Sequence, residues 1–371
     1  MKTSPATRKA HDDARWMSRA LALARLGEGC TRPNPAVGAV VVRNGRVLGE
    51  GFHRRAGLPH AEVEAINASR GSVHGATLYV TLEPCCTHGR TPPCTDLLIR
   101  SGIKRVVVGC ADPNPRHASR GFRILREAGI EVTRGVREDE CRQLIEPFAK
   151  RMTTGLPFVT LKLAMTLDGR IADRTGTSKW ITGPQARKIV QTLRRRADAV
   201  LVGAGTVAAD DPSLRCRMRG AGTAWRVVVD GNGRVPADAQ VLTDRWADAT
   251  IIATTAACAA SRRAAWACQG SQVWSLPGRD GRLNLRNLLK KMAKNNIMHV
   301  LCEGGGALAG GLLKAGLVDE LVLFYAPAIM GDARATSGFV GADFRLASMP
   351  RFCIKEVAHI GSDIMVRARC E

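Results

Sequence analysis

The chain has 371 residues, of which 45% are hydrophobic and 4% aromatic, and it carries a formal net charge of +22. This length suggests two domains, and the apolar content is sufficient for ordinary, mainly aliphatic cores. No apolar run approaches the roughly 18 residues of a membrane span, and the basic residues 1–11 lead into no apolar signal segment. The 12 cysteines are scattered rather than arranged as a secreted disulfide framework, so we expect a cytoplasmic protein with free or metal-bound thiols.

The first domain is expected over residues 1–150, where a β-hairpin precedes repeated helix–strand units. Asn44-Gly45 separates two apolar runs and is a strong two-residue hairpin signal. We expect a mixed sheet with helices on both faces. The predicted strands cover residues 36–43, 46–52, 76–82, 104–109 and 130–135. The predicted helices cover residues 12–28, 60–70, 95–101, 119–128 and 138–152, the last of which connects the domains.

The second domain is expected over residues 151–371 and continues an α/β pattern after Gly155-Leu156-Pro157. Two late segments, residues 352–358 and 363–369, are predicted to be antiparallel edge strands. The other predicted strands cover residues 158–164, 199–203, 226–230, 250–254, 297–302 and 319–325. The predicted helices cover residues 184–196, 256–268, 284–294 and 307–315.

A possible zinc site lies between residues 60 and 94. His60-Ala61-Glu62 fits the H-x-E half of the zinc-deaminase signature, in which the Glu is not a ligand. Pro84-Cys85 and Cys94 supply two thiols, separated by eight residues rather than by the short spacing of P-C-x-x-C. A zinc ion on one imidazole and two thiolates lowers the pKa of bound water, which suits hydrolytic removal of an amino group. The alternative is that no metal binds here and that the histidine lies near cytosolic thiols by chance.

This long form of the motif includes residues 81–85 (TLEPC) and 89–94 (GRTPPC), and it resembles the deaminase half of the bifunctional riboflavin-biosynthesis deaminase/reductases. The resemblance continues through residues 161–169 and 303–311. It implies an N-terminal cytidine-deaminase-like three-layer αβα domain and a C-terminal dihydrofolate-reductase-like domain. It also implies deamination of 2,5-diamino-6-ribosylamino-4(3H)-pyrimidinone 5′-phosphate to a uracil derivative, and then NADPH-dependent reduction of the ribosyl group to ribityl.

The resemblance assigns roles in the deaminase domain. It implies that Zn²⁺ is bound by His60, Cys85 and Cys94, with Glu62 as the proton shuttle. Cys86 is an alternative ligand, although adjacent thiolates do not easily bind one tetrahedral ion, so Cys85 is favoured. His88 is expected to serve loop structure. Substrate contacts are implied for Asn34, His53, Arg90 and Thr91, whose ordinary alternatives are a turn cap, a solvated strand residue and loop ordering.

The reductase site is expected around the glycine run that follows Glu303. Glycines between a strand and a helix let backbone amides approach a phosphate, although a tight turn explains them equally well. The resemblance implies contacts with NADPH by Ala164, Trp180, Thr206, Asp210, Gly305, Gly306, Ala307, Leu308, Ala309, Gly310 and Gly311. It implies contacts with the ribosyl substrate by Ser178, Arg194, Leu214, Arg217 and Glu303. At position 231 the residue is Gly, which leaves only backbone for a cofactor contact.

Hydride transfer from NADPH to the anomeric carbon needs an electrophile and one proton. Lys162, Asp210 and Glu303 are the candidates for this polar environment, and the sequence does not decide which of them handles the proton. The alternative is that these residues have only structural roles, in which case residues 210–212 form a turn and Lys162 is a charged residue at the end of a strand.

Two other functions compete with this one. A base deaminase acting on RNA would use the positive charge, and Arg194–Arg196 is either a phosphate site or a solvated helix end. The long loop between the thiols and the second domain argue against RNA. A non-catalytic zinc module is the other alternative, which Glu62→Gln would test. We therefore expect a phosphorylated pyrimidine as partner, no nucleic acid or membrane, and a homo-oligomer.

Overall fold

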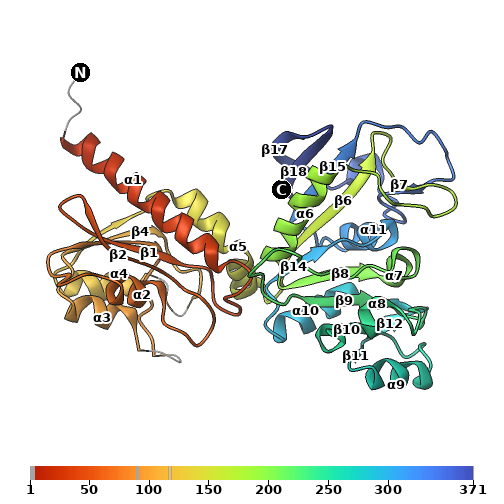
Figure 1. Ribbon diagram of the computed structural model, residues 1–371, viewed down its shortest axis with the longest axis horizontal. Coiled ribbons are helices and arrows are strands. Elements are labelled where there is room, and N and C mark those ends of the chain that lie inside the picture. Colours follow the sequence, from red (N-terminus) through yellow and green to blue (C-terminus); the bar gives the residue numbers. More distant parts are fainter. Residues whose placement is uncertain (1–4, 89–91, 116, 118, 371) are drawn as a thin grey trace. The chain divides into compact units, whose positions relative to one another are not determined.

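The computed structural model describes residues 5–88, 92–115, 117 and 119–370, and it divides into two compact units. The first unit is Met1–Gly155 and the second is Leu156–Glu371. Both are sheets covered by helices (Figure 1). No helix among the described residues is both long enough and apolar enough to cross a bilayer.

The first unit contains a five-stranded mixed sheet in the order β2-β1-β3-β4-β5. Its strands are β1 (Gly38–Arg43), β2 (Arg46–Phe52), β3 (Thr77–Leu82), β4 (Arg105–Cys110) and β5 (Glu131–Arg134). β1 is antiparallel to β2 and β3, whereas β3, β4 and β5 are parallel. The hairpin between β1 and β2 turns at Asn44 and Gly45, which have φ angles of 52° and 70°. These left-handed conformations favour Asn-Gly, so the predicted hairpin is confirmed.

Helices cover both faces of this sheet and make three layers, as expected. The helices are α1 (Pro5–Ala24), followed by the short η1 (Arg25–Gly27), α2 (Ala61–Asn67), α3 (Cys94–Arg100), α4 (Arg120–Glu127) and α5 (Glu138–Thr154). Side chains of α2, α3 and α4 pack on one face, including Leu98 and Phe122. Side chains of α1 and α5 pack on the other face, including Met17 and Ile145. Residues that alternate along β1, β3 and β4 therefore enter two separate apolar clusters.

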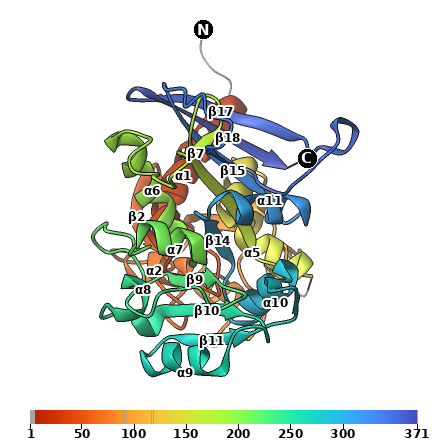
Figure 2. The same cartoon turned by 90° about the vertical axis from the view of Figure 1, so that its right-hand side faces the viewer.

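The second unit contains a nine-stranded sheet in the order β11-β10-β9-β8-β14-β6-β15-β18-β17. The strands from β11 to β15 are parallel, and β18 and β17 are antiparallel (Figure 2). They are β6 (Phe158–Thr166), β8 (Ala199–Gly203), β9 (Trp225–Val229), β10 (Thr250–Thr254), β11 (Gln272–Ser275), β14 (His299–Cys302), β15 (Glu320–Ala326), β17 (Phe352–Ile360) and β18 (Asp363–Cys370). Two short ribbons pair β7 (Arg170–Ala172) with β16 (Thr336–Ser337) and β12 (Gly278–Arg279) with β13 (Arg282–Leu283).

Helices also cover both faces of the second sheet. α6 (Pro184–Arg196), α7 (Ala204–Asp210), α8 (Gln240–Thr243) and α9 (Ala260–Cys268) pack on one face, while α10 (Leu285–Lys294) and α11 (Gly306–Lys314) pack on the other. The 3-10 turns are η2 (Ala247–Ala249) and η3 (Leu346–Ser348). The expected two-domain α/β fold is thus confirmed, including the late antiparallel pair, of which β17 forms the sheet edge.

The sequence missed several short elements of the second unit. α7, with the sequence AGTVAAD, directly follows β8 without any polar interruption. Its helical pattern is too short to be recognised by periodicity. The edge strand β11 and the ribbons of two or three residues were missed for the same reason.

Candidate functional site

The first candidate site is a metal centre formed by His60, Cys85 and Cys94. The His60 Nδ1 atom lies 3.5 Å from Cys85 Sγ and 3.4 Å from Cys94 Sγ. All three ligand atoms lie within 4.8 Å of one another, and this is the group of potential metal ligands found among the described residues. Zn–N and Zn–S bonds of about 2.0 and 2.3 Å at tetrahedral angles separate N and S by about 3.5 Å. The three side chains therefore fit one tetrahedral zinc ion with a fourth position open.

Element ends bring these ligands together. His60 is the N-cap of α2, Cys94 is the first residue of α3, and Cys85 follows β3. A hydrogen bond with the Cys94 side chain is the largest of several influences that lower the pKa of the Cys85 thiol. The backbone amide of Cys94, which donates to Cys85 Sγ at 3.4 Å, acts in the same direction. The buried Glu83 carboxylate accepts from the backbone amides of Asp112 (3.1 Å) and Gly121 (2.9 Å). Glu83 thus ties the segment before Cys85 to the loop after β4.

Glu62 lies in the first turn of α2, and its side chain is buried beside the ligands. Burial raises the pKa of Glu62 to about 7, and the Cys85 thiolate acts in the same direction. A carboxyl group with this pKa can both accept and release a proton near neutral pH. It is also held on a helix rather than on a loop, which fixes its distance from the centre.

Asn34 and His53 form a pair next to His60. The His53 ring lies edge-on to the His60 ring, with the ring centroids 5.3 Å apart. His53 Nδ1 is 3.0 Å from the carbonyl oxygen of Pro59, which can only accept, so this nitrogen carries the proton. His53 Nε2 must then accept from the Asn34 amide Nδ2 at 3.0 Å. Burial lowers the pKa of His53 and favours this neutral form. The carbonyl oxygen of Asn34 is left to accept from a ligand.

Cys86 points to a different neighbour, since its Sγ atom lies 3.7 Å from His117 Nδ1. Neither Cys86 nor the exposed His88 belongs to the ligand group found among the described residues. The geometry agrees with the choice of Cys85 over Cys86. The predicted substrate residues Arg90 and Thr91 lie outside the described residues.

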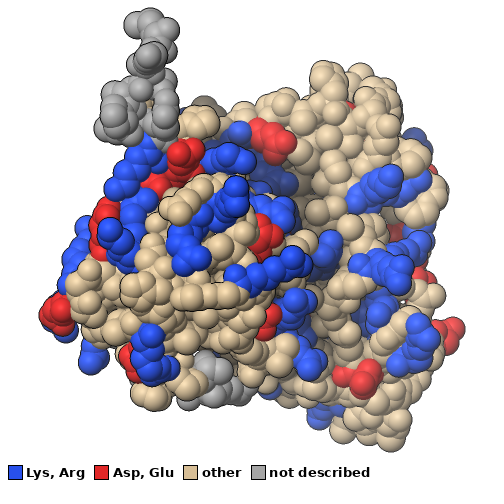
Figure 3. Space-filling model, turned by 60° about the vertical axis from the view of Figure 1, so that its left-hand side comes forward, with Lys and Arg blue, Asp and Glu red and all other residues tan. Residues whose placement is uncertain are grey.

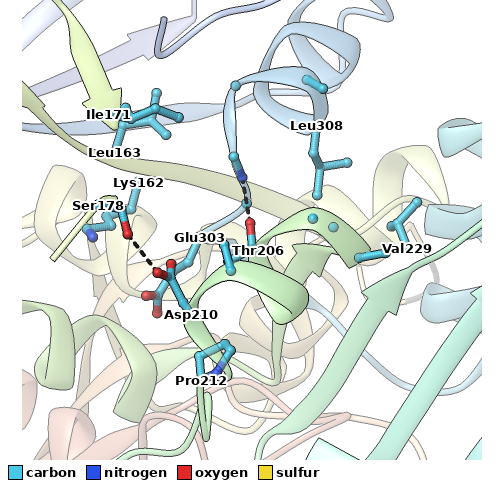
Figure 4. Close-up of a pocket in the computed structure, with 18 of the residues that line it drawn as sticks. Lys162, Leu163, Ile171, Ser178, Thr206, Asp210, Pro212, Val229, Glu303 and Leu308 are labelled. Atoms are coloured by element: carbon cyan, nitrogen blue, oxygen red, sulfur yellow. Dashed lines mark hydrogen bonds between the residues drawn. The ribbon is translucent and has the colours of Figure 1, made fainter. Parts of the chain in front are cut away.

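The second candidate site is a cleft of about 2140 Å³ in the second unit (Figure 4). A pocket for a single small ligand measures about 300–1,000 Å³, so this cleft has room for a cofactor and a substrate together. It opens at the carboxyl ends of β6, β14, β8 and β9, which are neighbours in the sheet. Chain connections diverge at this point, because β8 leads toward β11 while β14 is inserted between β8 and β6. Open parallel sheets bind ligands at such switch points.

An ion pair lies deep in the cleft. The Arg194 Nε and Nη2 atoms donate to Glu303 Oε1 and Oε2 at 2.6 and 2.9 Å, and only 13% and 9% of the two side chains are exposed. Arg194 also donates to the carbonyl oxygen of Arg215 at 3.1 Å. Burial alone would raise the pKa of Glu303, but Arg194 and Lys162 outweigh it and lower that pKa. Burial lowers the pKa of the Lys162 ammonium, and Glu303 opposes this effect.

A hydrogen-bonded pair, Ser178 and Asp210, also lines the cleft. The Ser178 hydroxyl donates to Asp210 Oδ1 at 2.6 Å, and Lys179 Nζ donates to the Asp210 carbonyl oxygen at 2.6 Å. Figure 4 shows Lys162, Ser178, Asp210 and Glu303 gathered on one side of the view, with Val229 on the other. Asp210 is the last residue of α7, so the predicted turn begins one residue later.

Two glycine-containing turns form the middle of the cleft. α7 follows β8 at Gly203 and Gly205, and α11 follows β14 at Gly305. A Cβ atom built on Gly203 or Gly205 would meet nothing within 4 Å, and one on Gly305 would meet only Thr206 Oγ1 at 3.5 Å. The Gly305 amide donates to Thr206 Oγ1 at 3.1 Å, which joins the two turns. The turns therefore leave open space where the backbone can approach a dinucleotide.

Comparison with known proteins agrees with both sites. The cytidine and deoxycytidylate deaminase zinc-binding region matches residues 10–110, and the RibD C-terminal domain matches residues 157–366. The riboflavin biosynthesis protein RibD of Escherichia coli K12 is 42% identical over 95% of this chain and 98% of its own length. The chain belongs to the RibD family. The RibD protein of Aquifex aeolicus is 44% identical over 95% of this chain and 97% of its own length.

Solved structures of RibD proteins have the same fold. The RibD protein of Acinetobacter baumannii (form 1) superposes with a TM-score of 0.87 at 38% identity, covering 98% of this chain and 99% of its own. The diaminohydroxyphosphoribosylaminopyrimidine deaminase/5-amino-6-(5-phosphoribosylamino)uracil reductase of Thermotoga maritima gives 0.86 at 38% identity, covering 98% and 100%. The resemblance noted from the motifs is confirmed. This chain is a bifunctional deaminase/reductase of riboflavin biosynthesis, and its cofactors are zinc and NADPH.

The cleft also gathers most of the reductase residues predicted from the RibD resemblance. It is lined by Lys162, Ala164, Ser178, Trp180, Arg194, Thr206, Asp210, Leu214, Arg217, Glu303, Gly305, Gly306, Ala307, Leu308 and Gly311. Ala309 and Gly310 are buried in α11 instead: Ala309 belongs to the apolar core, and a Cβ atom on Gly310 would meet the Val340 carbonyl oxygen at 2.1 Å.

The sequence missed some residues that line this RibD cleft. The turn with Gly203 and Gly205 lacked any recognisable motif, although two glycines after a predicted strand were a weak signal. Gln191 accepts from the Arg217 backbone amide at 2.8 Å and was also missed. At Gly231 the backbone of the β12–β13 ribbon fills the space, since a Cβ atom there would lie 1.7 Å from the Gly281 carbonyl oxygen. A backbone-only contact at this position stays a prediction.

Proposed function

We propose that this chain deaminates 2,5-diamino-6-ribosylamino-4(3H)-pyrimidinone 5′-phosphate in residues 1–150 and reduces the deaminated product in residues 151–371. The RibD relatives supply the chemistry, and the metal centre and the cleft support its division between the two ranges. This proposal rests on one observation: the buried side chain of Glu62 lies beside three side chains of the kinds that bind zinc.

In the deaminase step, His60, Cys85 and Cys94 would hold the zinc ion, which would supply a Lewis acid that lowers the pKa of water. Glu62 takes the proton and returns it to the leaving amino group, which its pKa of about 7 permits. Asn34, oriented by His53, accepts from an amino group of the pyrimidine through its free carbonyl oxygen. Arg90 and Thr91 remain proposed contacts of the ribose phosphate.

In the reductase step, NADPH supplies the hydride. The turns at Gly305 and Thr206 would hold its pyrophosphate, and the cleft residues Ala164, Trp180, Ala307, Leu308 and Gly311 would contact the cofactor. Glu303 has both carboxylate oxygens engaged by Arg194 and a lowered pKa, so it stays ionised and orients substrate hydroxyls. Lys162 is the proton donor of this step, because burial makes its ammonium more acidic.

The other substrate contacts follow from the positions of polar groups in the cleft. Asp210 orients the Ser178 hydroxyl toward the ribosyl chain. Arg217 binds the substrate phosphate, with its backbone fixed by Gln191. Arg194 acts through Glu303 rather than as a free phosphate ligand, and Leu214 packs against the substrate.

Lys and Arg side chains are spread over the surface, and the face in Figure 3 carries many more of them than of Asp and Glu. We assign this charge to attraction of phosphorylated pyrimidines, not of nucleic acid or membranes, and we place the protein in the cytoplasm, where thiolate ligands stay reduced. The twelve cysteines are all free, as zinc binding by two of them requires. A homo-oligomer remains our expectation, which light scattering after gel filtration tests.

The decisive experiment offers the diaminopyrimidinone ribotide to purified protein with and without NADPH and follows ammonia and NADPH absorbance. Ammonia should appear without NADPH, and NADPH should be consumed only after deamination. Glu62→Gln should keep its zinc and release ammonia about 10² to 10⁴ times more slowly. Wild-type rates in this variant would remove Glu62 from the mechanism, and RNA deamination instead would favour the competing function.

A further inference from the structure

No polar group of the reductase cleft is yet assigned to the pyrimidine ring of the substrate. Glu303 and Ser178 are assigned to the ribosyl chain and Arg217 to the phosphate, and both parts of the molecule are the same before and after deamination. The ring is where the two compounds differ, because deamination replaces a 2-amino group with a 2-oxo group. A hydrogen-bond donor on the ring is thereby exchanged for an acceptor. Selecting the deaminated compound therefore requires a group that faces this ring.

Gln191 is an amide side chain at the substrate end of the cleft. It lies on α6 one turn before Arg194, and both residues line the cleft. Other Asn and Gln residues of the described chain that line the cleft lie after β9, on α8 or at the start of α10, and they are Asn232, Gln240, Asn284 and Asn287. Gln191 is therefore the amide closest in the fold to the residues assigned to the substrate.

Three hydrogen bonds fasten α6 to the cleft segment that carries Arg217. Gln191 Oε1 accepts from the backbone amide of Arg217 at 2.8 Å, and the carbonyl oxygen of Gln191 accepts from Cys216 Sγ at 3.3 Å. One turn further along α6, Arg194 Nη1 donates to the Arg215 carbonyl oxygen at 3.1 Å. The Gln191 amide is thus part of a fixed wall, and it cannot turn over without breaking its bond to Arg217.

The bond to Arg217 determines which atom of the Gln191 amide remains for a ligand. A backbone N–H can only donate, so the atom that accepts from it is the side-chain oxygen of Gln191. The other atom, Nε2, carries two hydrogens and can only donate. Within the described part of the second unit Nε2 has no hydrogen-bond partner, and Gln191 is half-buried in the cleft wall. The cleft therefore presents a fixed donor, which pairs with a ring carbonyl oxygen but not with a ring amino group.

Apolar side chains of the same wall suit the face of a planar ring. Val190, the residue before Gln191, and Leu214 both line the cleft, and they are only 8% and 2% exposed. A pyrimidine that lies against these groups has its polar atoms at its edge, where Gln191 Nε2 can donate. A donor that is desolvated there without an acceptor costs about 1–3 kcal/mol. The wall can thus distinguish the two rings by their hydrogen bonding, although their size and shape are nearly the same.

We infer that Gln191 donates to the 2-oxo group of the deaminated pyrimidine and thereby makes the reductase reject the 2-amino compound. This inference rests on the proposed reductase function, and it assigns the order of the two reactions to one side chain. The arrangement is the counterpart of the deaminase site, where His53 fixes the Asn34 amide so that its carbonyl oxygen accepts from an amino group. Rejection of the wrong compound then depends on a polar group left unpaired, which discriminates more strongly than a small difference in size.

The test compares reduction of the two compounds by the full chain carrying Glu62→Gln, which slows deamination and keeps the 2-amino compound intact. Initial rates of NADPH consumption give kcat/KM for the diaminopyrimidinone ribotide and for its deaminated product, and ammonia measured in parallel corrects for residual deamination. This parent should prefer the deaminated product by about 10- to 100-fold. Gln191→Met should bring the ratio close to one. Gln191→Glu should reverse it, because the carboxylate oxygen that does not face Arg217 accepts from the 2-amino group.

Gln240→Met is the matched control, because it makes the same substitution at another glutamine of the cleft, on α8 instead of α6. It should leave the ratio as in the parent. Calorimetric binding of NADP⁺, which should be the same in the parent and in all the variants, shows that the second unit remains folded.

A purely structural role of Gln191 gives a different result. If Gln191 only held Arg217, Gln191→Met would weaken both compounds by the same factor, because both carry the same phosphate, and this outcome would overturn the inference. So would an unchanged ratio in Gln191→Met, or a parent that reduces both compounds equally well. Absence of NADPH consumption with either compound would instead refute the proposed reductase function, so the two failures are distinguishable.

Discussion

Glu303→Gln tests how the deep end of the reductase cleft is held together. The substitution preserves the volume of the side chain but removes the charge from a bidentate pair with bonds of 2.6 and 2.9 Å. Only 13% of the Arg194 and 9% of the Glu303 side chain is exposed, so screening by solvent is small. Breaking such a buried pair costs about 3–5 kcal/mol. We expect about 3 kcal/mol, because the Gln amide can still accept from Arg194 and because Arg194 keeps its bond to the Arg215 carbonyl oxygen.

The loss of unfolding free energy in Glu303→Gln should be larger at neutral pH than at acidic pH. Arg194 and Lys162 hold the folded-state pKa of Glu303 below its ordinary value of 4.5, against the effect of burial. A lowered carboxyl pKa stabilises the fold above the unfolded pKa, and this contribution disappears as the pH falls through the folded pKa. The difference in free energy of unfolding between wild type and variant should be full at pH 7 and shrink below pH 4.5.

Urea unfolding of the full chain, followed by probes of each unit, measures this difference, and the second unit should melt about 6 to 12 °C lower at pH 7. Ammonia release below the melting range should stay at the wild-type rate, while reduction is lost. Glu356→Gln is the control, since Glu356 lies 3.6 Å from Arg367 and is 49% exposed, which limits its effect to about 1 kcal/mol. Equal stability of Glu303→Gln and wild type at pH 7, or a difference that does not shrink as the pH falls below 4.5, would refute the reasoning.

Three further predictions concern the two sites. His60→Ala should lose zinc and ammonia release but still reduce deaminated substrate, and loss of both activities in a folded variant would show that the units are not independent. Cys85→Ser should lose most of its zinc by mass spectrometry, whereas Cys86→Ser should retain about one ion per chain, because only Cys85 faces His60; the reverse pattern would exchange their roles. Gly305→Val should fold normally but bind NADP⁺ at least about tenfold more weakly in calorimetry, since its side chain enters the open turn, and unchanged affinity would move the pyrophosphate elsewhere.

The sequence alone determined the fold class and the chemistry of the deaminase site. Alternation of apolar residues and the Asn44-Gly45 turn predicted the hairpin and most of the helices and strands, because these signals are local. The motif from His60 to Cys94 predicted a zinc centre, since its residue types are those that zinc and deamination require. Zinc ligation by Cys85 in place of Cys86 also followed from the family resemblance, and it agrees with the contacts of the two thiols.

Only the tertiary structure decided which groups meet in the reductase cleft. Arg194 and Glu303 are 109 residues apart, and nothing local in the chain indicates that they bind each other rather than two parts of a substrate. Ala309 and Gly310 belong to the predicted glycine segment, yet the helix turns them into the core. The segment after β9 and the β12–β13 ribbon pack closely only because Gly231 and Gly281 have no side chains. Such pairings depend on strand order and packing between distant segments, which the pattern of neighbouring residues does not encode.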